Sequence, residues 1–577
     1  MKRNLYVLLS LLVLSSVVLA ACGGPPATEA PVATEPPATE APATEAPTEV
    51  ATEAPAYDGL MVESPDCDYG GEVKSIEAVD EFTVKLTLCV PDPAVPAKVA
   101  FTSLSIQPSE YLESTGATGD ILEKPIGTGP YMIESWERGN QLVLKRFDGF
   151  RGEPAHSETL VFRWGTESAQ RLLELQSGTV DAIDNVGPDD FETVEGDSNL
   201  QLVKREALNI MYVGMTNTFP PFDNELVRQA FAQAIDRQRI VDNFYPAGSE
   251  VASHFTPCSV PNGCEGDEWY AFDPEAAKAL LEEAGYGASN PFPTVKLHYR
   301  DVVRGYLPDP GIVAQDIQAQ LKENLGVTVE INVMESGAFI DAANSGSLDG
   351  MHLLGWTADF PDVVNFLDAH FSAAAYDQFG TAFDDITDNL ASGGQLADPA
   401  DRAPFYAAAN NAIKQHVPMI PVVHGGSAVA AKASVSGVHA SPLGNEELAV
   451  FDNGADTFVW MQSAEPISLF CPDETDGESL RACEQVTESL LAYEVGGTAT
   501  ETTGLAESYE PNEDLTEWTF HLRQGVTFHD GSTLDANDVV LSYALQWDAS
   551  HPLHKGNTGA FEYWTYLFGT FLNAPAQ

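Results

Sequence analysis

The stretch that decides the fold class is residues 313–333, VAQDIQAQLKENLGVTVEINV. In its first part an apolar residue recurs every four positions, which predicts a helix with one buried face; these residues are Val313, Ile317, Leu321 and Leu325. Gly326 ends the helix, because glycine accepts the left-handed backbone that closes a helix. Residues 327–333 then alternate between apolar and polar side chains, which predicts a strand. A helix followed at once by a strand is typical of an α/β fold.

The same succession recurs on both sides of this stretch. Asp273-Pro274 opens a helix that Gly285 ends, because aspartate caps a helix and proline suits its first turn. Further segments predict strands at 82–88 and 180–186 and helices at 169–176 and 226–235. We therefore predict a mixed α/β fold with partly parallel sheets.

Composition excludes several classes of protein. The 577 residues contain 28 Lys and Arg against 86 Asp and Glu, a formal charge of −58. This excess excludes a nucleic-acid binder, which needs a basic face, and it disfavours electrostatic binding to a membrane surface. Only the N-terminus carries a long apolar run, so a multi-pass membrane protein is excluded. The acidity is more in keeping with solubility or a salty habitat than with selection of cationic ligands, although both interpretations remain open.

The first 56 residues are predicted to be an export signal and a stalk. Lys2 and Arg3 precede the apolar residues 5–19, and small residues lead to Cys22. This pattern resembles a bacterial lipoprotein signal, which implies removal of residues 1–21 and attachment of lipid to Cys22. An ordinary signal peptide with an incidental cysteine is the alternative. Residues 22–56 repeat Pro, Thr, Glu and Ala and are predicted to be a disordered stalk.

Six cysteines remain in the body of the chain. An even number in an exported protein predicts disulfides, and proximity in sequence favours three local pairs. Six cysteines allow 15 connectivities, and a mixture of free and paired thiols remains an alternative. The favoured pairs are Cys67 with Cys89, Cys258 with Cys264, and Cys471 with Cys483.

Catalytic signatures are missing from the sequence. No G-x-S-x-G, H-E-x-x-H, Walker or G-x-G-x-x-G motif is present. Residues 127–131, GTGPY, lack the Lys-Ser/Thr of a phosphate loop and predict a structural turn. Residues 528–531, FHDG, are a turn before a capped helix rather than an acid/base or metal site. We therefore expect no catalytic residues, no metal site and no cofactor.

Several motifs together resemble the family 5 extracytoplasmic solute-binding proteins of ABC importers, the oligopeptide, dipeptide and nickel-binding type. They are PIGTGPY at 125–131, AQRLLELQSG at 169–178, VRQAFAQAIDR at 227–237 and GWTADFPD at 355–362. The resemblance implies a two-lobed periplasmic-binding-protein fold, type II-like, with an extra subdomain on lobe I.

The order of the motifs differs from that of the family. The pieces that open family members stand here at the C-terminus: a strand at 456–461, a turn at 465–469, a helix ending at 489–493, and then LAESY at 505–509 and FHLRQGVTFHDG at 520–531. This order predicts a circular permutation, which exposed chain ends permit. Phe470-Cys471 replaces the family's Asp-Pro and puts the ligand-facing geometry of the turn in doubt.

The resemblance also implies a division of the chain. The subdomain joins 57–125 with 496–577, lobe I joins 126–255 with 424–495, and lobe II is 256–423. The hinge crossings are expected near Phe255 and His424. Closure of the lobes on a ligand is the implied mechanism.

The implied function is that of a lipid-anchored receptor at the outer face of the bacterial cytoplasmic membrane. Its partners are then a ligand, most simply a peptide, and a permease with its ATPase, and we expect a monomer that binds no nucleic acid. Receptors for nickel, a metallophore, an oligosaccharide or another solute, and a sensor without a transporter, remain alternatives; an exported hydrolase is disfavoured. The expected ligand-binding residues are Asp359, Trp356, Phe360 and Glu465. The resemblance implies that Asp359 holds a peptide's α-ammonium.

Overall fold

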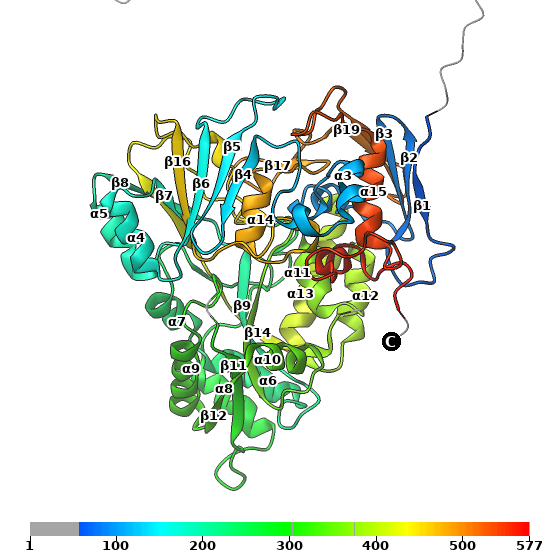
Figure 1. Ribbon diagram of the computed structural model, residues 1–577. Helices are drawn as coiled ribbons and strands as arrows, with labels where there is room; N and C mark the ends of the chain where they lie inside the picture. Colours follow the sequence, from blue (N-terminus) through cyan, green and yellow to red (C-terminus); the bar gives the residue numbers. More distant parts are fainter. Residues whose placement is uncertain (1–56, 303, 374, 576–577) are drawn as a thin grey trace, which may run out of the picture. The chain divides into compact units, whose positions relative to one another are not determined.

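The computed structural model describes residues 57–302, 304–373 and 375–575. The predicted signal, Cys22 and the stalk lie outside these residues. Within them no helix combines the length and the apolar character needed to span a membrane. Three large sheets organise this part of the chain (Figure 1).

The first sheet has seven strands, in which β16 lies parallel to both β6 and β7. Its order is β4 (Tyr131–Glu137), β5 (Gln141–Arg146), β6 (Thr159–Trp164), β16 (Thr457–Gln462), β7 (Ala182–Ile183), β15 (Ser427–Lys432) and β8 (Leu200–Arg205). Its helices are α4 (Ser168–Ser177), α5 (Phe191–Gly196) and α14 (Gly477–Glu484).

The second sheet has six strands, in which β11 is parallel to β12 and β13. Its order is β10 (Glu250–Val251), β14 (Met419–His424), β9 (Asn209–Met215), β13 (Met351–Thr357), β11 (Val295–Arg300) and β12 (Val329–Met334). The helices of this part are α6 (Glu225–Ala234), α7 (Arg237–Phe244), α8 (Pro274–Glu283), α9 (Pro310–Leu325), α10 (Ser336–Asn344), α11 (Val363–Phe371), α12 (Asp384–Gly393) and α13 (Pro399–His416).

The third sheet combines both ends of the described chain. Its order is β1 (Met61–Glu63), β2 (Val73–Asp80), β3 (Thr83–Leu88), β20 (Glu517–Leu522) and β19 (Ala506–Pro511). The pairing of β20 with β3 is antiparallel and sets Trp518 opposite Leu86. Its helices are α2 (Val95–Lys98), α3 (Ser109–Thr115), α15 (Ala536–Trp547) and α16 (Glu562–Phe568).

Two large hydrophobic cores hold these sheets. The seven-stranded and five-stranded sheets share one core, to which Trp460 and Phe520 contribute fully buried side chains. The six-stranded sheet has a core of its own, with Tyr212 and Leu353 inside it. Phe360, which follows β13 of the six-stranded sheet, packs in the first core and so connects the two parts.

Most predicted elements are present, and three expectations are corrected. The strand expected at 180–186 is reduced to the two residues of β7. The helix expected to end at residues 489–493 ends at Glu484, and Ala492–Tyr493 instead forms the short strand β17, paired with β18 (Thr500–Glu501). The first crossing between the lobes was expected near Phe255, but the chain enters the six-stranded sheet at β9, directly after β8. The chain returns to the seven-stranded sheet between β14 and β15, next to His424.

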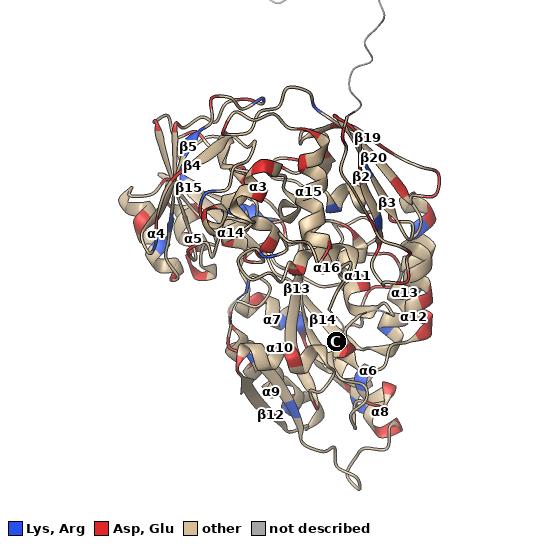
Figure 2. Ribbon diagram, turned by 45° about the vertical axis from the view of Figure 1, so that its right-hand side comes forward, with Lys and Arg blue, Asp and Glu red and all other residues tan. Residues whose placement is uncertain are grey.

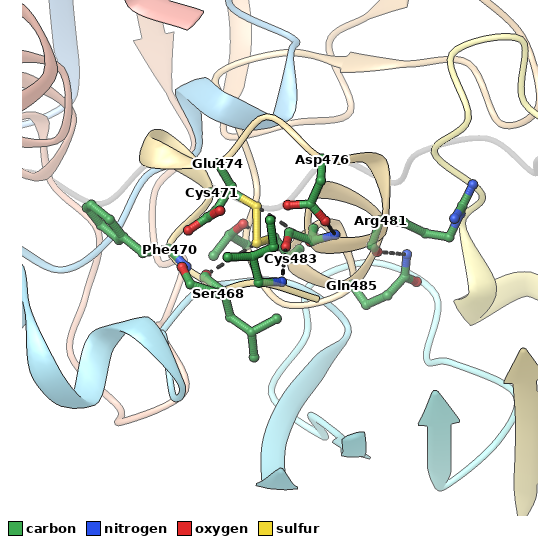
Figure 3. The surroundings of a disulfide bond; sticks show 12 residues. Ser468, Phe470, Cys471, Glu474, Asp476, Arg481, Cys483 and Gln485 are labelled. Carbon is green, nitrogen blue, oxygen red and sulfur yellow. Dashed lines mark hydrogen bonds between the residues drawn. A yellow bond between two sulfur atoms is a disulfide. The ribbon is translucent and has the colours of Figure 1, made fainter. Parts of the chain in front are cut away.

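The structure contains three disulfides, and they are the pairs that proximity in sequence favours. Cα–Cα distances are 5.6 Å for Cys67–Cys89, 5.0 Å for Cys258–Cys264 and 6.2 Å for Cys471–Cys483. The last pair joins the turn after β16 to α14 (Figure 3).

Acidic residues are distributed over many elements. Figure 2 shows them on α5, α8 and α12 among others, rather than in a single patch. The net charge therefore does not mark a single site by itself.

Candidate functional site

Asp359 lies in the loop between β13 and α11, at the carboxyl end of a central strand of the six-stranded sheet. This is the strand-to-loop exit that the GWTADFPD motif predicts. Asp362 caps α11 by accepting a hydrogen bond from the backbone N–H of Val364 at 3.0 Å, so the loop ends at a fixed point.

Asn365, in the first turn of α11, holds this loop in place. Its Oδ1 accepts hydrogen bonds from the backbone N–H of Asp359 at 3.0 Å and from Nε1 of Trp356 at 3.1 Å. Its Nδ2 donates to Oδ2 of Asp359 at 3.1 Å. Because Asn365 is only 5% exposed, these bonds are shielded from water and fix both Asp359 and Trp356.

Aromatic side chains from α16 meet Asp359 and Trp356. Tyr563 hydrogen-bonds the carboxylate of Asp359. The ring of Tyr566 lies edge-on to Trp356, with 6.4 Å between the ring centroids. Trp356 also packs edge-on against His370 of α11 at 5.1 Å. The group Asp359, Trp356, Asn365, Tyr563 and Tyr566, called here the Asp359 group, thus combines residues about 200 positions apart in the sequence.

The carboxylate of Asp359 has no cationic partner among the described residues. Burial raises the pKa of Asp359 to about 6, and the hydrogen bonds from Asn365 and Tyr563 only partly offset that effect. Burial raises the pKa of Tyr563 well above its ordinary value, and the negative charges of Asp359 and Asp476 raise it further. A partly buried negative group without a counter-charge costs free energy, and a bound cation would recover it.

Asp476 belongs to the turn that follows β16, where the sequence departs from the family pattern. It accepts a hydrogen bond from the backbone N–H of Ser479 at 2.8 Å and so caps α14 (Figure 3). Nearby, Glu474 accepts from Nδ2 of Asn557 at 2.9 Å, and burial raises its pKa to about 7. The disulfide Cys471–Cys483 ties this acidic turn to the helix, so the replacement of Asp-Pro by Phe470-Cys471 gives the turn a covalent support.

A family model described as "Bacterial extracellular solute-binding proteins, family 5 Middle" matches residues 41–378 and 501–560. The chain belongs to this family. It is accordingly a binding protein and not an enzyme, and its α/β fold is the two-lobed fold of the relatives below.

Individual relatives agree with the family assignment. The chain is 30% identical to "Di/tripeptide-binding protein 1" of Pseudomonas aeruginosa over 379 residues, 64% of this chain and 70% of that protein. Among solved structures, HbpA2 from Haemophilus parasuis matches with a TM-score of 0.58 and 31% identity, covering 64% of this chain and 74% of that chain. The dipeptide-binding protein from Pseudoalteromonas sp. SM9913, solved in complex with Met-Leu, matches with a TM-score of 0.57 and 25% identity, covering 66% and 76%.

The other two expected ligand-binding residues of this family 5 protein lie in different surroundings. Phe360 is 2% exposed and packs in the first core, with Nζ of Lys98 5.9 Å from its ring centroid. Glu465 accepts hydrogen bonds from Nε1 of Trp136 at 3.1 Å and from the backbone N–H of Gly139. The structure therefore brings Asp359 and Trp356 together but gives Glu465 a role in holding the turn between β4 and β5.

The two motifs that were assigned to turns do act as turns. A Cβ on Gly127 would lie 2.1 Å from the carbonyl oxygen of Val486, so this close approach requires glycine. His529 donates its backbone N–H to the carbonyl of Gly127 at 2.9 Å, which joins the two turns to each other. Asp535 and Asp538 form the predicted capping box of α15.

Sequence reasoning missed Asn365, Tyr563 and Tyr566. Asn365 follows Asp359 by six residues and stands in the first turn of a helix, which does not distinguish it from an ordinary polar position. Tyr563 and Tyr566 are three residues apart on α16, so they share a helix face. This spacing could indicate a binding surface, but in a helix rich in aromatic residues it is equally typical of a face that is buried in the core.

Proposed function

We propose that this family 5 protein is the lipid-anchored receptor of an ABC importer for short peptides, and that Asp359 holds the peptide's α-ammonium. Two relatives support the ligand class. The P. aeruginosa protein is named for di- and tripeptides, and the Pseudoalteromonas protein was solved with Met-Leu. The predicted lipid on Cys22 and the stalk would hold the body outside the membrane and close to the transporter.

The observation that carries the proposal is the carboxylate of Asp359. It is held by Asn365 and Tyr563, it has no cationic partner among the described residues, and its pKa is raised to about 6. An ammonium ion placed there would form a charge-assisted hydrogen bond in a poorly solvated site, where such bonds are stronger than in water. Trp356 and Tyr566 would offer aromatic faces to the same cation.

Closure of two lobes would complete this site. Asp359 and Trp356 belong to the part built on the six-stranded sheet, whereas Tyr563 and Tyr566 come from the part built on the five-stranded sheet. Only two strand-to-strand connections, β8 to β9 and β14 to β15, run between the six-stranded and seven-stranded sheets within the described chain. We place the hinge at these connections. Contacts made to the ligand from both sides would then favour the closed state.

The lobes would be the predicted ones with one boundary moved. Lobe II would run from β9 to β14, lobe I would include the seven-stranded sheet, and the subdomain would join 57–125 with 496–577. The circular permutation has support from the five-stranded sheet, in which β3 and β20 are neighbours. A variant that links Pro575 to Tyr57 and opens the chain before β16 should fold and bind with the same affinity. If that variant failed to fold, the circular permutation would be contradicted, but the proposed ligand would not be.

The ligand is tested by isothermal titration calorimetry with the whole chain. A dipeptide with a free amino group should bind. The Asp359→Asn variant should bind this dipeptide more weakly by about 2 kcal/mol or more, roughly 30-fold. N-acetylation of the peptide should weaken binding to the wild type similarly and to the variant little further. Asp341→Asn, an exposed change in α10, is the matched control and should leave affinity unchanged. Equal affinity of wild type and Asp359→Asn would contradict the ammonium role, and mass spectrometry of the co-purified ligand would then identify the correct class.

A further inference from the structure

A large cavity lies away from the Asp359 group. Its volume is about 970 Å³, and it is lined by the loop 150–156, by residues 484–495 after α14 and by segments next to β19 and β20. Among the described residues, none from the part between β9 and β14 lines it, and none of the Asp359 group does. The size is that of a site for a small molecule.

The charged side chains of this cavity are mostly acidic. Two arginines, Arg151 and Arg523, stand among its lining residues against six glutamates: Glu153, Glu447, Glu484, Glu488, Glu501 and Glu507. Both arginines are already engaged. Arg151 pairs with Glu488 at 2.6 Å and donates to the carbonyl of Gly504 at 2.7 Å, and Arg523 donates to the same carbonyl at 3.0 Å. The described lining therefore carries an excess of negative charge, and both of its cations are already bound to other groups.

Two polar groups of the lining have no partner among the described residues. Oε1 of Glu484 accepts from Nδ2 of Asn445 at 2.9 Å, but its Oε2 is buried and makes no hydrogen bond. Ser105 is 1% exposed, and its Oγ is also without a hydrogen bond. Buried polar groups are normally satisfied, so such groups at the wall of a cavity point to a ligand. Glu484 is also the last residue of α14, where the helix dipole adds negative potential.

The glutamates of the cavity raise one another's pKa values, because their negative charges repel. Burial, helped by the charges of Glu447 and Glu446, raises the pKa of Glu484 to about 8. The pKa of Glu447 is raised too, by burial and then by Glu488 and Glu501. A cation in the cavity would reverse these effects, because an opposite charge favours the ionised carboxylates.

We propose that this cavity is a second binding site, for a small alkyl diamine whose ammonium groups reach Glu484 and Glu447. The rest of the lining suits the alkyl body of such a ligand, since Pro130, Val450, Leu491 and Val526 contribute apolar surface. A single metal ion would leave most of the volume unfilled.

The test is calorimetric titration of the whole chain with 1,4-diaminobutane at pH 7, with 1,4-butanediol as the uncharged probe of the same length. The diamine should bind with one-to-one stoichiometry and the diol should not. Binding should release protons, because the ammonium ionises Glu484, and titration in buffers of different ionisation enthalpy measures that release. Glu484→Gln should weaken the diamine at least about tenfold and abolish the proton release, and Glu447→Gln should weaken it as well.

Two controls separate this site from others. Glu513→Gln removes an exposed charge outside the cavity and should change nothing, and Asp359→Asn should leave the diamine's affinity unchanged. Thermal unfolding verifies that each variant is folded. Absence of diamine binding to the wild type, equal weakening by Glu513→Gln, or loss in Asp359→Asn with full binding to Glu484→Gln would each overturn the proposal.

Discussion

Asn365 forms two hydrogen bonds with Asp359: it accepts one from the backbone N–H and donates one to the carboxylate. The same side chain accepts from the indole of Trp356. One buried amide therefore sets the position of the charge and of the aromatic wall beside it. Residues with such a role are expected to matter for binding without touching the ligand.

Asn365→Ala should lower peptide affinity and stability together. It leaves the backbone N–H of Asp359 and Nε1 of Trp356 without an acceptor, and each unsatisfied buried donor costs about 1 to 3 kcal/mol. We expect at least about tenfold weaker binding by calorimetry and a lower free energy of unfolding in urea. Asn389→Ala is the control, because its side chain reaches only a carbonyl of its own helix. If both variants bind like the wild type, Asn365 does not position the site.

The raised pKa of Asp359 predicts how affinity depends on pH. A peptide ammonium needs the ionised carboxylate, so affinity should be highest near pH 7. It should decrease above that pH as the free peptide's α-amino group, with a pKa near 8, loses its proton, and it should fall as the pH drops below 6, where Asp359 is protonated. Calorimetry between pH 5 and pH 8 measures this fall. Asp359→Asn should bind weakly at every pH and show no such slope, whereas a slope retained in the variant would assign the titration to another group.

The same pKa has the opposite consequence for stability. Since the pKa of Asp359 is higher in the folded chain than in the unfolded one, the contribution of Asp359 to stability is greatest below the unfolded pKa near 3.9 and decreases as the pH rises through about 6. Without ligand, Asp359→Asn should therefore stabilise the protein at pH 8, by about 3 kcal/mol. Urea unfolding of ligand-free protein tests it. A destabilised variant would mean that the carboxylate is structurally required.

How far the sequence predicts the structure depends on whether a feature has a local cause. Helix starts were predicted correctly where aspartate caps them, as at Asp273 and Asp535, because capping involves only neighbouring residues. The crossing next to His424 carries two glycines, whereas residues 206–208 between β8 and β9 contain neither glycine nor proline. Without such a break, the first crossing was placed nearly 50 residues too late.

The candidate site shows the same limit. The motif around Asp359 is local, and the resemblance assigned it a role. The contact with Tyr563 joins residues about 200 positions apart, and only the fold brings them together. Sequence patterns of period two or 3.6 report which face of an element is buried, but not which element covers that face.

Loss of the Cys471–Cys483 disulfide should destabilise the turn beside the site. Closing a loop with a separation of 12 residues is worth about 3 kcal/mol in the chain-entropy model, and the separation of 6 in Cys258–Cys264 about 2 kcal/mol. Replacing each pair by alanines should lower the free energy of unfolding in that order, and only Cys471→Ala with Cys483→Ala should also weaken peptide binding. Equal peptide affinities in both double variants would separate the turn from the site.

A buried network of four charges should determine how the stability of the part built on the seven-stranded sheet changes at acidic pH. Arg205 pairs with Asp184 at 2.7 Å and with Glu446 at 2.5 Å, and Arg481 contacts the same two carboxylates at 2.9 and 2.7 Å. Glu446→Gln leaves two buried guanidinium groups short of negative charge, so it should lower the free energy of unfolding by about 3 to 5 kcal/mol at pH 7. Glu323→Gln, an exposed change on α9, is the control.

The pH dependence of this loss gives a sharper test. The two arginines lower the pKa of Asp184 to about 2, and they lower the pKa of Glu446 as well. A carboxylate whose pKa is lower in the folded state contributes stability above its unfolded pKa near 4, and that contribution disappears as the pH falls toward the folded value. The gap between wild type and Glu446→Gln in urea unfolding should therefore be constant from pH 7 to about pH 5 and should shrink between pH 4 and pH 2. A gap that does not change across this range would show that Glu446 acts by packing and hydrogen bonding rather than by its charge.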